Sequence, residues 1–289
     1  MSSRTTIMKR TFLTGLACLF FTSTPTAWAD EAKSSFILNT PDLVAFWDFQ
    51  EEGGQKRSSK GGSAAIDLFE KKGPVMRVSG GLFGPYSARF KRGQWLITPR
   101  KDIGALNIHG KDAQVTVIAW IKREDKSPWQ ALAGVWDETR KKRQYCLFLY
   151  GTTATRADEM KRYPVKDRIH GHVSAVGGPS PGEKFCITYS SGNTSIEFDK
   201  WYCVAMTYDG SHSKVYVNGK LDVWEHRNPF PYEDGLYDGG HDGADFTVGA
   251  VHRGGSWGNF FGGGMAGVAV YKRALTPEEL AKLAHKTLK

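Results

Sequence analysis

Residues 201–222 carry two turn signals on either side of an alternating segment, and this pattern predicts a β-hairpin. Val215 and Val217 recur at every second position, which is the period of a strand with one apolar face. The dipeptides Asp209-Gly210 and Asn218-Gly219 accept the positive φ angles that two-residue turns between antiparallel strands require. The chain is therefore expected to contain antiparallel sheet.

Short strand-like runs separated by turns recur along most of the chain. Their spacing is typical of an antiparallel sandwich, and several runs are apolar on both faces, as expected for inner strands of stacked sheets. No connecting segment is long or uniform enough for a domain linker, so residues 30–289 are expected to form one domain. The runs cover residues 42–49, 87–99, 115–123, 130–138, 143–151, 168–176, 184–190, 246–251 and 265–273.

One short helix is expected at the C-terminal end. Thr276 suits the N-cap, Pro277 the first helical position and Glu279 the third, which together make a capping box.

Residues 1–29 have the features of a secretory signal peptide. Lys9 and Arg10 precede a short apolar run, which ends before Ala27-Trp28-Ala29, a small-residue cleavage site. The run is shorter than the roughly 20 residues that span a bilayer. The protein is expected to be secreted, in a periplasm or outside the cell, without a transmembrane segment.

The formal charge is positive. Removing residues 1–29 lowers it from +9 to +6, and this excess favours polyanionic partners or simply keeps the protein in solution. Export argues against nucleic acid as the partner. Nothing in the sequence indicates an oligomeric state.

Three of the four cysteines lie beyond residue 29. In an oxidising compartment one pair is expected to form a disulfide, and the sequence does not choose among the three pairings of Cys146, Cys186 and Cys203.

With strands and helix in this order, the chain resembles the laminin-G-like (LamG) jelly roll of the concanavalin A-like lectin and glucanase superfamily. The matching pieces span roughly residues 43–283. The resemblance implies an all-β, two-sheet antiparallel jelly-roll sandwich with a short C-terminal helix. Members of this superfamily bind carbohydrate, mediate adhesion, hydrolyse glycosides or cleave polysaccharides, so the fold leaves the function open. The pieces are AFWDFQEEGG, GLFGPYSARFKRGQWLITP, VTVIAWIKR, WYCVAMTYDGSHSKVYVNGKLD, FTVGA and GMAGVAVYKRALTPEEL.

A glucanase of this superfamily would carry carboxylates in an E-x-D-x-x-E pattern on one strand. Glu197 and Asp199 begin this pattern, but Tyr202 stands where the acid/base residue is needed. Hydrolysis is therefore not the expected activity.

His170 and His172 are the most suggestive local feature. Residues i and i+2 of a strand point to one face, so the two imidazoles are expected to converge, and the same spacing relates Arg143 to Tyr145 on the neighbouring run. If the two runs pair, all four side chains share one face. They could bind an acidic sugar, or they could act as a lyase, with a cation neutralising the uronate and Tyr or His taking the C5 proton.

The segment 252–259 is the second candidate binding region. Trp257 can stack on a sugar ring and Asn259 can bond its hydroxyls, with His252 and Arg253 beside them. Trp129 and Trp136 could extend such a platform. The alternative is a flexible loop whose Phe260 and Phe261 pack in the core.

The loop 233–245 places carboxylates among glycines, which is the composition of oxygen-rich calcium sites. Asp238, Asp242 and Asp245 are the expected ligands if Ca²⁺ binds, although the spacing is not that of an EF-hand. A solvated acidic loop is the alternative.

These observations favour a secreted, lectin-like protein that recognises acidic or sulfated polysaccharide or glycoconjugate. The alternative is a polysaccharide lyase that acts on a uronate-containing glycan through Arg143, Tyr145, His170 and His172. A protein–protein adhesion module is the third possibility.

Overall fold

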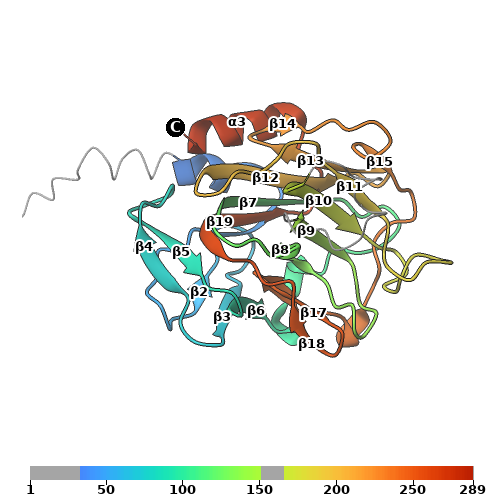
Figure 1. Cartoon of the computed structure of the whole chain (residues 1–289), viewed down its shortest axis with the longest axis horizontal. Coiled ribbons are helices and arrows are strands. Elements are labelled where there is room, and N and C mark those ends of the chain that lie inside the picture. Colours follow the sequence, from blue (N-terminus) through green and yellow to red (C-terminus); the bar gives the residue numbers. More distant parts are fainter. Residues whose placement is uncertain (1–32, 151–165, 289) are drawn as a thin grey trace, which may run out of the picture.

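The computed structural model describes residues 33–150 and 166–288, and in it two large antiparallel sheets stack as a sandwich (Figure 1). The nine-stranded sheet contains β1 Leu43–Trp47, β4 Met76–Ser79, β5 Tyr86–Phe90, β7 Val115–Arg123, β12 Trp201–Tyr208, β13 His212–Val217, β14 Lys220–Leu221, β15 Phe230–Pro231 and β19 Gly263–Tyr271. Its order is β14-β13-β12-β7-β19-β5-β4, with β1 pairing with β19 and β15 with β13.

The eight-stranded sheet carries the candidate site. It contains β2 Arg57–Ser58, β3 Asp67–Lys71, β6 Trp95–Thr98, β8 Trp129–Val135, β9 Tyr145–Tyr150, β10 Arg168–Val173, β11 Tyr189–Ser191 and β16 Phe246–Val248. Its order is β11-β10-β9-β8-β16-β6-β3-β2. The remaining elements are the small hairpin of β17 Val251–Arg253 and β18 Ser256–Gly258, three short 3-10 helices at Arg100–Asp102, Gly104–Leu106 and Gly240–Asp242, a helical segment over 33–38, and α3 Pro277–Thr287.

Strand alternation sorts the apolar side chains into layers. Between the two sheets, Met206 of β12 and Leu147 of β9 belong to one large buried cluster. On the outer face of the nine-stranded sheet, Trp120 packs with Leu283 of α3. A smaller cluster around Phe148 lies on the outer face of the eight-stranded sheet. The fold is thus the expected all-β sandwich with a short C-terminal helix.

The segment 201–222 forms the predicted hairpin, with β12 paired to β13 and β13 to β14. Asn218 and Gly219 both have positive φ, at 50° and 78°, as the two-residue turn requires. The first turn is longer than predicted. Gly210 has φ of 90°, but Asp209 does not have positive φ, and its carboxylate accepts hydrogen bonds from the backbone N–H groups of the two residues after Gly210.

Two of the predicted strand runs are wrong in detail. Residues 87–99 form two strands, β5 and β6, which belong to different sheets, because the chain turns at Gly93 with φ of 96°. Residues 184–190 are mostly irregular, and only their end enters β11. The short strands β3 and β4 were not expected, since neither carries a clear alternating pattern.

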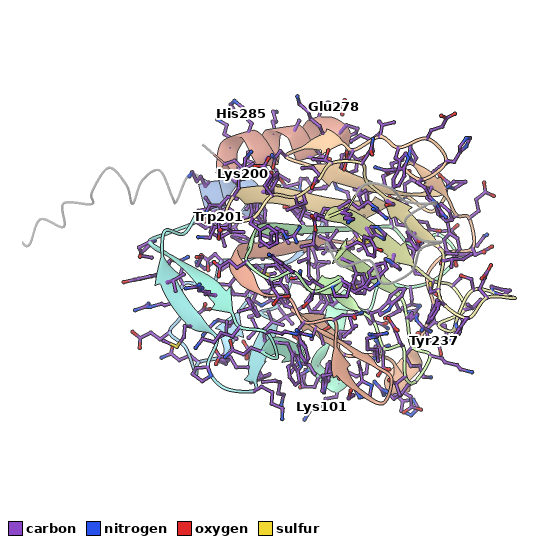
Figure 2. All side chains as sticks on the ribbon, viewed as in Figure 1. Lys101, Lys200, Trp201, Tyr237, Glu278 and His285 are labelled. Carbon is purple, nitrogen blue, oxygen red and sulfur yellow. The ribbon has the colours of Figure 1, made fainter. Side chains whose placement is uncertain are left out.

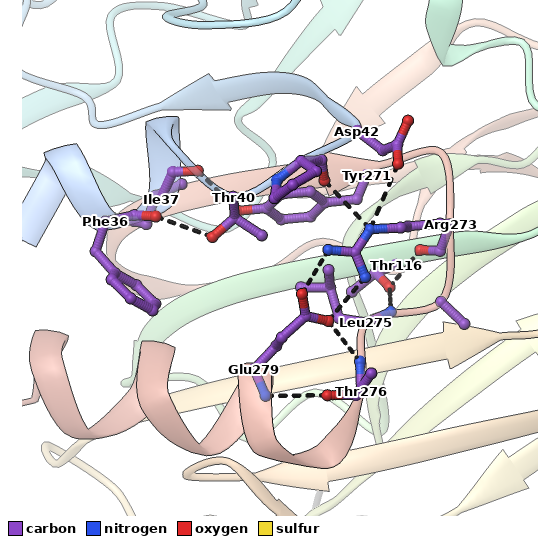
Figure 3. A network of polar contacts seen from close by, with 12 residues as sticks. Phe36, Ile37, Thr40, Asp42, Thr116, Tyr271, Arg273, Leu275, Thr276 and Glu279 are labelled. Atoms are coloured by element: carbon purple, nitrogen blue, oxygen red, sulfur yellow. Dashed lines mark hydrogen bonds and ion pairs between the residues drawn. The ribbon is translucent and has the colours of Figure 1, made fainter.

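Helix α3 begins with the predicted capping box. The Thr276 hydroxyl accepts from the backbone N–H of Glu279, and the Glu279 carboxylate accepts from that of Thr276. The same carboxylate accepts hydrogen bonds from both terminal nitrogens of Arg273, at 2.7 and 2.6 Å. The guanidinium of Arg273 also lies 3.5 Å from the carboxylate of Asp42 (Figure 3). This network joins the start of the helix to the start of β1.

No disulfide is formed within residues 33–150 and 166–288. Cys146, Cys186 and Cys203 are all free and buried, so the expected pairing is wrong. Cys203 lies in the cluster beneath α3, whereas Cys146 and Cys186 belong to the cluster on the opposite outer face, so the sandwich separates Cys203 from both. The Cys186 sulfur lies 3.2 Å from the Thr188 hydroxyl, and the Cys146 sulfur lies 3.7 Å from the carbonyl oxygen of Leu147.

The predicted signal peptide at residues 1–29 lies outside the described residues. Within residues 33–150 and 166–288, no helix combines the length and the apolar character that crossing a membrane requires.

Candidate functional site

His170 and His172 project from the outer face of the eight-stranded sheet. Gly171 between them faces the sandwich interior, where an added Cβ would come within 2.9 Å of the Met206 side chain and 3.0 Å of that of Val215. The two imidazoles therefore share one face, as their i, i+2 spacing predicts, and their rings stack with centroids 5.8 Å apart.

Aromatic rings from three neighbouring strands contact this pair of imidazoles. Tyr189 of β11 stacks on both, with centroids 4.9 Å from His170 and 4.5 Å from His172. The Trp129 ring of β8 lies nearly perpendicular to both imidazoles, with centroids at 5.2 and 5.9 Å. Two further contacts come from β9: Phe148 at 4.9 Å from His172, and Tyr150 at 5.5 Å from His170.

Both imidazoles are buried and neutral. His170 is 1% exposed and His172 is 6% exposed. Burial lowers the pKa of His172 to about 3, helped by the nearby charge of Arg143. Burial also lowers the pKa of His170 well below its usual value, and the Arg168 charge acts in the same direction. At neutral pH each ring can therefore both donate and accept a hydrogen bond.

His172 has an unusual polar environment. Neither of its ring nitrogens has a hydrogen-bond partner in the part of the chain that the structure describes. Buried polar groups of this kind are generally satisfied by protein, water or ligand. This imidazole is therefore a group that a bound water or ligand would complete.

Tyr145 does not join the two histidines, and the expectation of a shared face is wrong for this residue. It lies between the sheets, fully buried, and its hydroxyl donates to the backbone carbonyl of Leu106 at 2.7 Å. Burial raises the pKa of this hydroxyl well above its usual value. The reason is that β9 begins at Tyr145, so Arg143 precedes the strand and strand alternation does not relate the two residues.

Arg143 does reach the outer face. Its guanidinium carbon lies 5.8 Å from the centroid of the Trp136 ring, which itself lies 5.4 Å from the His172 ring. One terminal nitrogen donates to the backbone carbonyl of Gly177 at 3.3 Å. The other lies 3.9 Å from the Glu138 carboxylate. Arg143 thus places a cation beside the aromatic cluster.

The β17–β18 hairpin lies beside the same face. Trp257 stacks on Trp95 of β6 with centroids 4.8 Å apart, and its ring lies 5.3 Å from His252. His252 is partly exposed and lies 3.7 Å from the carboxylate of Asp137. Asn259 contributes its backbone carbonyl to β8, where it accepts from the Ala131 N–H at 2.7 Å. Stacking on Trp95 fixes the orientation of the Trp257 ring.

Glu138 connects the hairpin to the histidine cluster. Its Oε2 atom lies 3.7 Å from Arg253 and 3.9 Å from Arg143. Its Oε1 atom accepts from the indole N–H of Trp136 at 3.4 Å. Segments 143, 170–172 and 252–259 therefore meet on one side of one sheet.

Comparison with known families supports this architecture. A family model described as the concanavalin A-like lectin/glucanases superfamily matches residues 101–281. The chain belongs to this superfamily. No curated protein matches the sequence.

Solved structures share the fold of this concanavalin A-like chain. Their sequence identity to it is low, so the likeness shows a common fold and nothing more. Domain 4 of AbnA, an extracellular GH43 arabinanase of Geobacillus stearothermophilus solved with arabinotriose, is 18% identical with a TM-score of 0.53, over 84% of this chain and 98% of that one. Trypanosoma rangeli sialidase, solved with 2,3-difluorosialic acid as a covalent intermediate, is 15% identical with a TM-score of 0.52, over 90% and 37%.

The binding domain of botulinum neurotoxin DC, solved with rat synaptotagmin II, is 7% identical with a TM-score of 0.50, over 85% of this chain and 52% of that one. This concanavalin A-like chain therefore spans about half of the toxin structure and just over a third of the sialidase.

Sequence reasoning missed several members of the site. Arg168 continues the alternation of His170 and His172 backwards by two residues, and its guanidinium lies 4.6 Å from the Tyr150 ring centroid. Tyr189 belongs to β11, which pairs with β10, and the guanidinium of Arg227 lies 5.3 Å from its ring. The R-x-H-x-H alternation could have revealed Arg168. The long-range partners had no local signal.

The acidic loop of this concanavalin A-like chain does not gather its carboxylates, so the calcium expectation is not supported. Among the described residues, no group of three His, Cys, Asp or Glu side chains could hold a metal ion. Asp245 accepts the backbone N–H of Arg100 at 2.7 Å, Asp238 lies 3.5 Å from His109, and Asp242 lies 3.2 Å from His241. Tyr237 of this loop, labelled in Figure 2, instead offers its carbonyl to Gln144.

Proposed function

We propose that this protein is an exported, lectin-like protein that binds acidic or sulfated polysaccharide on the outer face of its eight-stranded sheet. The observation that carries the proposal is His172, a buried imidazole with no hydrogen-bond partner among the described residues, set between aromatic rings and beside the Arg143 cation. A sugar oxygen is a suitable partner for this ring.

The residue types on this face suit an anionic sugar. Aromatic rings stack on the apolar faces of pyranoses, and Trp257 is partly exposed and held by Trp95. Guanidinium groups bind carboxylate and sulfate oxygens with charge-assisted hydrogen bonds. The neutral imidazoles contribute hydrogen bonds without adding charge. Two structures of the same fold were solved with carbohydrate ligands, arabinotriose in one and difluorosialic acid in the other, which supports sugar as the ligand class.

A glycan array tests the proposal directly. The purified protein should bind uronate-containing or sulfated glycans, with and without EDTA, because the described residues contain no metal cluster. Trp257→Ala should weaken binding by about tenfold, since it removes a stacking ring. Trp201→Ala is the matched control, because this partly buried tryptophan packs with the apolar layer of the other sheet. Equal loss in both variants, or binding confined to neutral glycans, would count against the proposal.

A lyase is the second candidate function. The position of Tyr189 favours this residue over Tyr145 as the tyrosine that would take part in such a reaction. A uronate lyase removes the C5 proton, the released electron pair forms the C4=C5 double bond, the C4–O bond breaks, and the leaving oxygen takes a proton. Tyr189 stacks on both imidazoles and lies near Arg227, so a base, an acid and a cation lie within one cluster.

The two candidates are separated by the ultraviolet absorbance of the unsaturated uronate product. Alginate, ulvan and chondroitin-type polymers are incubated with the protein. A rise that is lost in Tyr189→Phe and kept in Tyr145→Phe would establish the lyase, and array binding without any rise supports the lectin. Failure to bind or cleave any glycan would favour the third possibility, an adhesion module for protein partners.

Export is part of the same proposal. The composition of residues 1–29 supports it. Expression of the full chain in a secreting bacterial host, followed by cell fractionation and N-terminal sequencing, tests it, and the expected mature sequence begins at Asp30. Recovery of the uncleaved chain from the cytoplasm would contradict export.

A further inference from the structure

Ser191 lies between Arg168 and His170 on the candidate face. The Nε atom of Arg168 donates to the Ser191 hydroxyl oxygen at 2.9 Å, and the same oxygen lies 3.1 Å from Nε2 of His170. Ser191 is directly opposite His170 in the pairing of β11 with β10. The register of two strands therefore sets this contact, and all three side chains are buried.

The positions of the hydrogens follow from the chemistry of the three groups. A guanidinium only donates, so the Ser191 oxygen is the acceptor of the first bond. Its own hydrogen then needs an acceptor, and the Nε2 atom of His170 is within reach. If Nε2 carried a proton instead, the buried serine hydrogen would be left without an acceptor, which disfavours that tautomer by roughly ten- to a hundredfold.

We infer that Ser191 and Arg168 hold His170 as the Nδ1–H tautomer, which makes this ring a hydrogen-bond donor to an oxygen of the bound glycan. The Nδ1 atom is buried and has no partner in the described part of the chain. Buried donors are normally paired, and a carboxylate, sulfate or hydroxyl oxygen would complete this one. The inference rests on the proposed function and assigns a direction to one of its hydrogen bonds.

This assignment separates the roles of the two imidazoles. His170 contacts the ligand only as a donor, because its lone pair at Nε2 is already used by Ser191, and Ser191 and Arg168 are the positioning residues. His172 keeps a free lone pair, since neither of its nitrogens is paired within the described residues. In the lyase alternative, His172 rather than His170 can therefore take a proton.

The first experiment measures the tautomer in the ligand-free, full-length protein. Long-range ¹H–¹⁵N correlation spectra at neutral pH distinguish a protonated Nδ1 from a protonated Nε2, and the signals of His170 are those that disappear in His170→Asn. We expect a protonated Nδ1 in the wild type, and an increased share of the other tautomer in Ser191→Ala. A protonated Nε2, or an imidazolium, in the wild type would overturn the inference.

The second experiment asks whether the donor is used. The probes are alginate and chondroitin sulfate oligosaccharides, measured by calorimetry with the folded state checked by circular dichroism. His170→Asn keeps an N–H close to the Nδ1 position and should bind within about fivefold of wild type, whereas His170→Leu should lose at least about tenfold. Equal affinities of the two variants would overturn the ligand contact.

The tautomer assignment of His170 and the proposed glycan binding can be overturned separately. A wild-type protein that shows the protonated Nδ1 but binds neither oligosaccharide nor any array glycan would overturn the proposed function, while the proton assignment would stand.

Discussion

At the residue scale, two histidines on one strand have different environments. The Nε2 atom of His170 contacts Ser191, whereas His172 has no polar partner among the described residues. The sequence predicts that both side chains share a face, because the strand period is two. It could not predict their burial, since the rings that cover them come from β8, β9 and β11.

We expect His172→Phe to stabilise the protein. The substitution removes two buried ring nitrogens without partners and keeps an aromatic ring against Phe148 and Tyr189, so the free energy of unfolding should rise by about 1 kcal/mol while glycan binding is lost. Urea denaturation followed by fluorescence measures the change.

His170→Phe is the matched control for that substitution. It deletes the group that the Ser191 hydroxyl contacts, and the unpaired hydroxyl should lower the free energy of unfolding by about 1–3 kcal/mol. If both variants were destabilised equally, His172 would have a polar partner in the folded protein.

The pH dependence of stability follows from the same burial. The folded-state pKa of His172 is about 3 against a usual 6.5, so the unfolded chain binds the extra proton between these values. Above about pH 6.5 this group does not lower the free energy of unfolding. Below that pH the free energy of unfolding falls as the pH decreases, by about 1.4 kcal/mol per pH unit for this one group.

Urea titrations from neutral pH down to about pH 4.5 compare wild type with His172→Phe, and the variant should show the shallower decline. Parallel curves would mean that His172 titrates normally in the folded protein.

At the element scale, patterns of period two located most strands, including β7 at Val115–Arg123, which matches its expected run. They failed where adjacent strands join different sheets, as at β5 and β6, and where both faces of a strand are covered. The segment YCLFLY of β9 is apolar throughout, so nothing local indicates which of its side chains face outward.

The two hairpin glycines should differ in their response to alanine. At Gly210 an added Cβ meets no atom within 4 Å, so Gly210→Ala should cost only the positive-φ strain, about 1–2 kcal/mol. At Gly219 it would lie 2.6 Å from the Cα of Ala281 and 2.7 Å from the carbonyl oxygen of Leu280 in α3.

Gly219→Ala should therefore cost at least about 1 kcal/mol more than Gly210→Ala, because α3 must shift. Chemical denaturation of both variants checks the difference. Equal losses would indicate that the helix does not pack on this turn.

At the scale of the whole molecule, the sandwich keeps its outer faces apart. Cys203 belongs to the layer under α3, and Cys146 and Cys186 belong to the layer on the opposite side. No local pattern in the sequence separates Cys203 from the other two, because strand pairing over long distances decides which face each cysteine occupies.

We expect thermal unfolding to be insensitive to reducing agent, since all three thiols are free. Burial raises the pKa of each thiol, so thiol reagents should label none of them until denaturant is added. A lower melting temperature in dithiothreitol would instead reveal a disulfide.

The net positive charge of the molecule predicts a salt effect on binding. Raising NaCl about tenfold shortens the Debye length roughly threefold, so affinity for a sulfated polymer should fall several-fold while affinity for any neutral glycan changes little. Calorimetry at the two salt concentrations tests this. A salt-independent affinity would assign recognition to stacking alone.

Helix α3 and the segment 33–38 pack on the outer face of the nine-stranded sheet, whereas His170 and His172 project from the outer face of the eight-stranded sheet, whose strand β10 is labelled in Figure 1. A fluorophore, a biotin or a solid support attached at the exposed side of α3 would therefore leave the histidine face pointing into solution. The exposed side of α3 is therefore a suitable attachment point for oriented biosensor surfaces, on which large polymers could reach the histidine face.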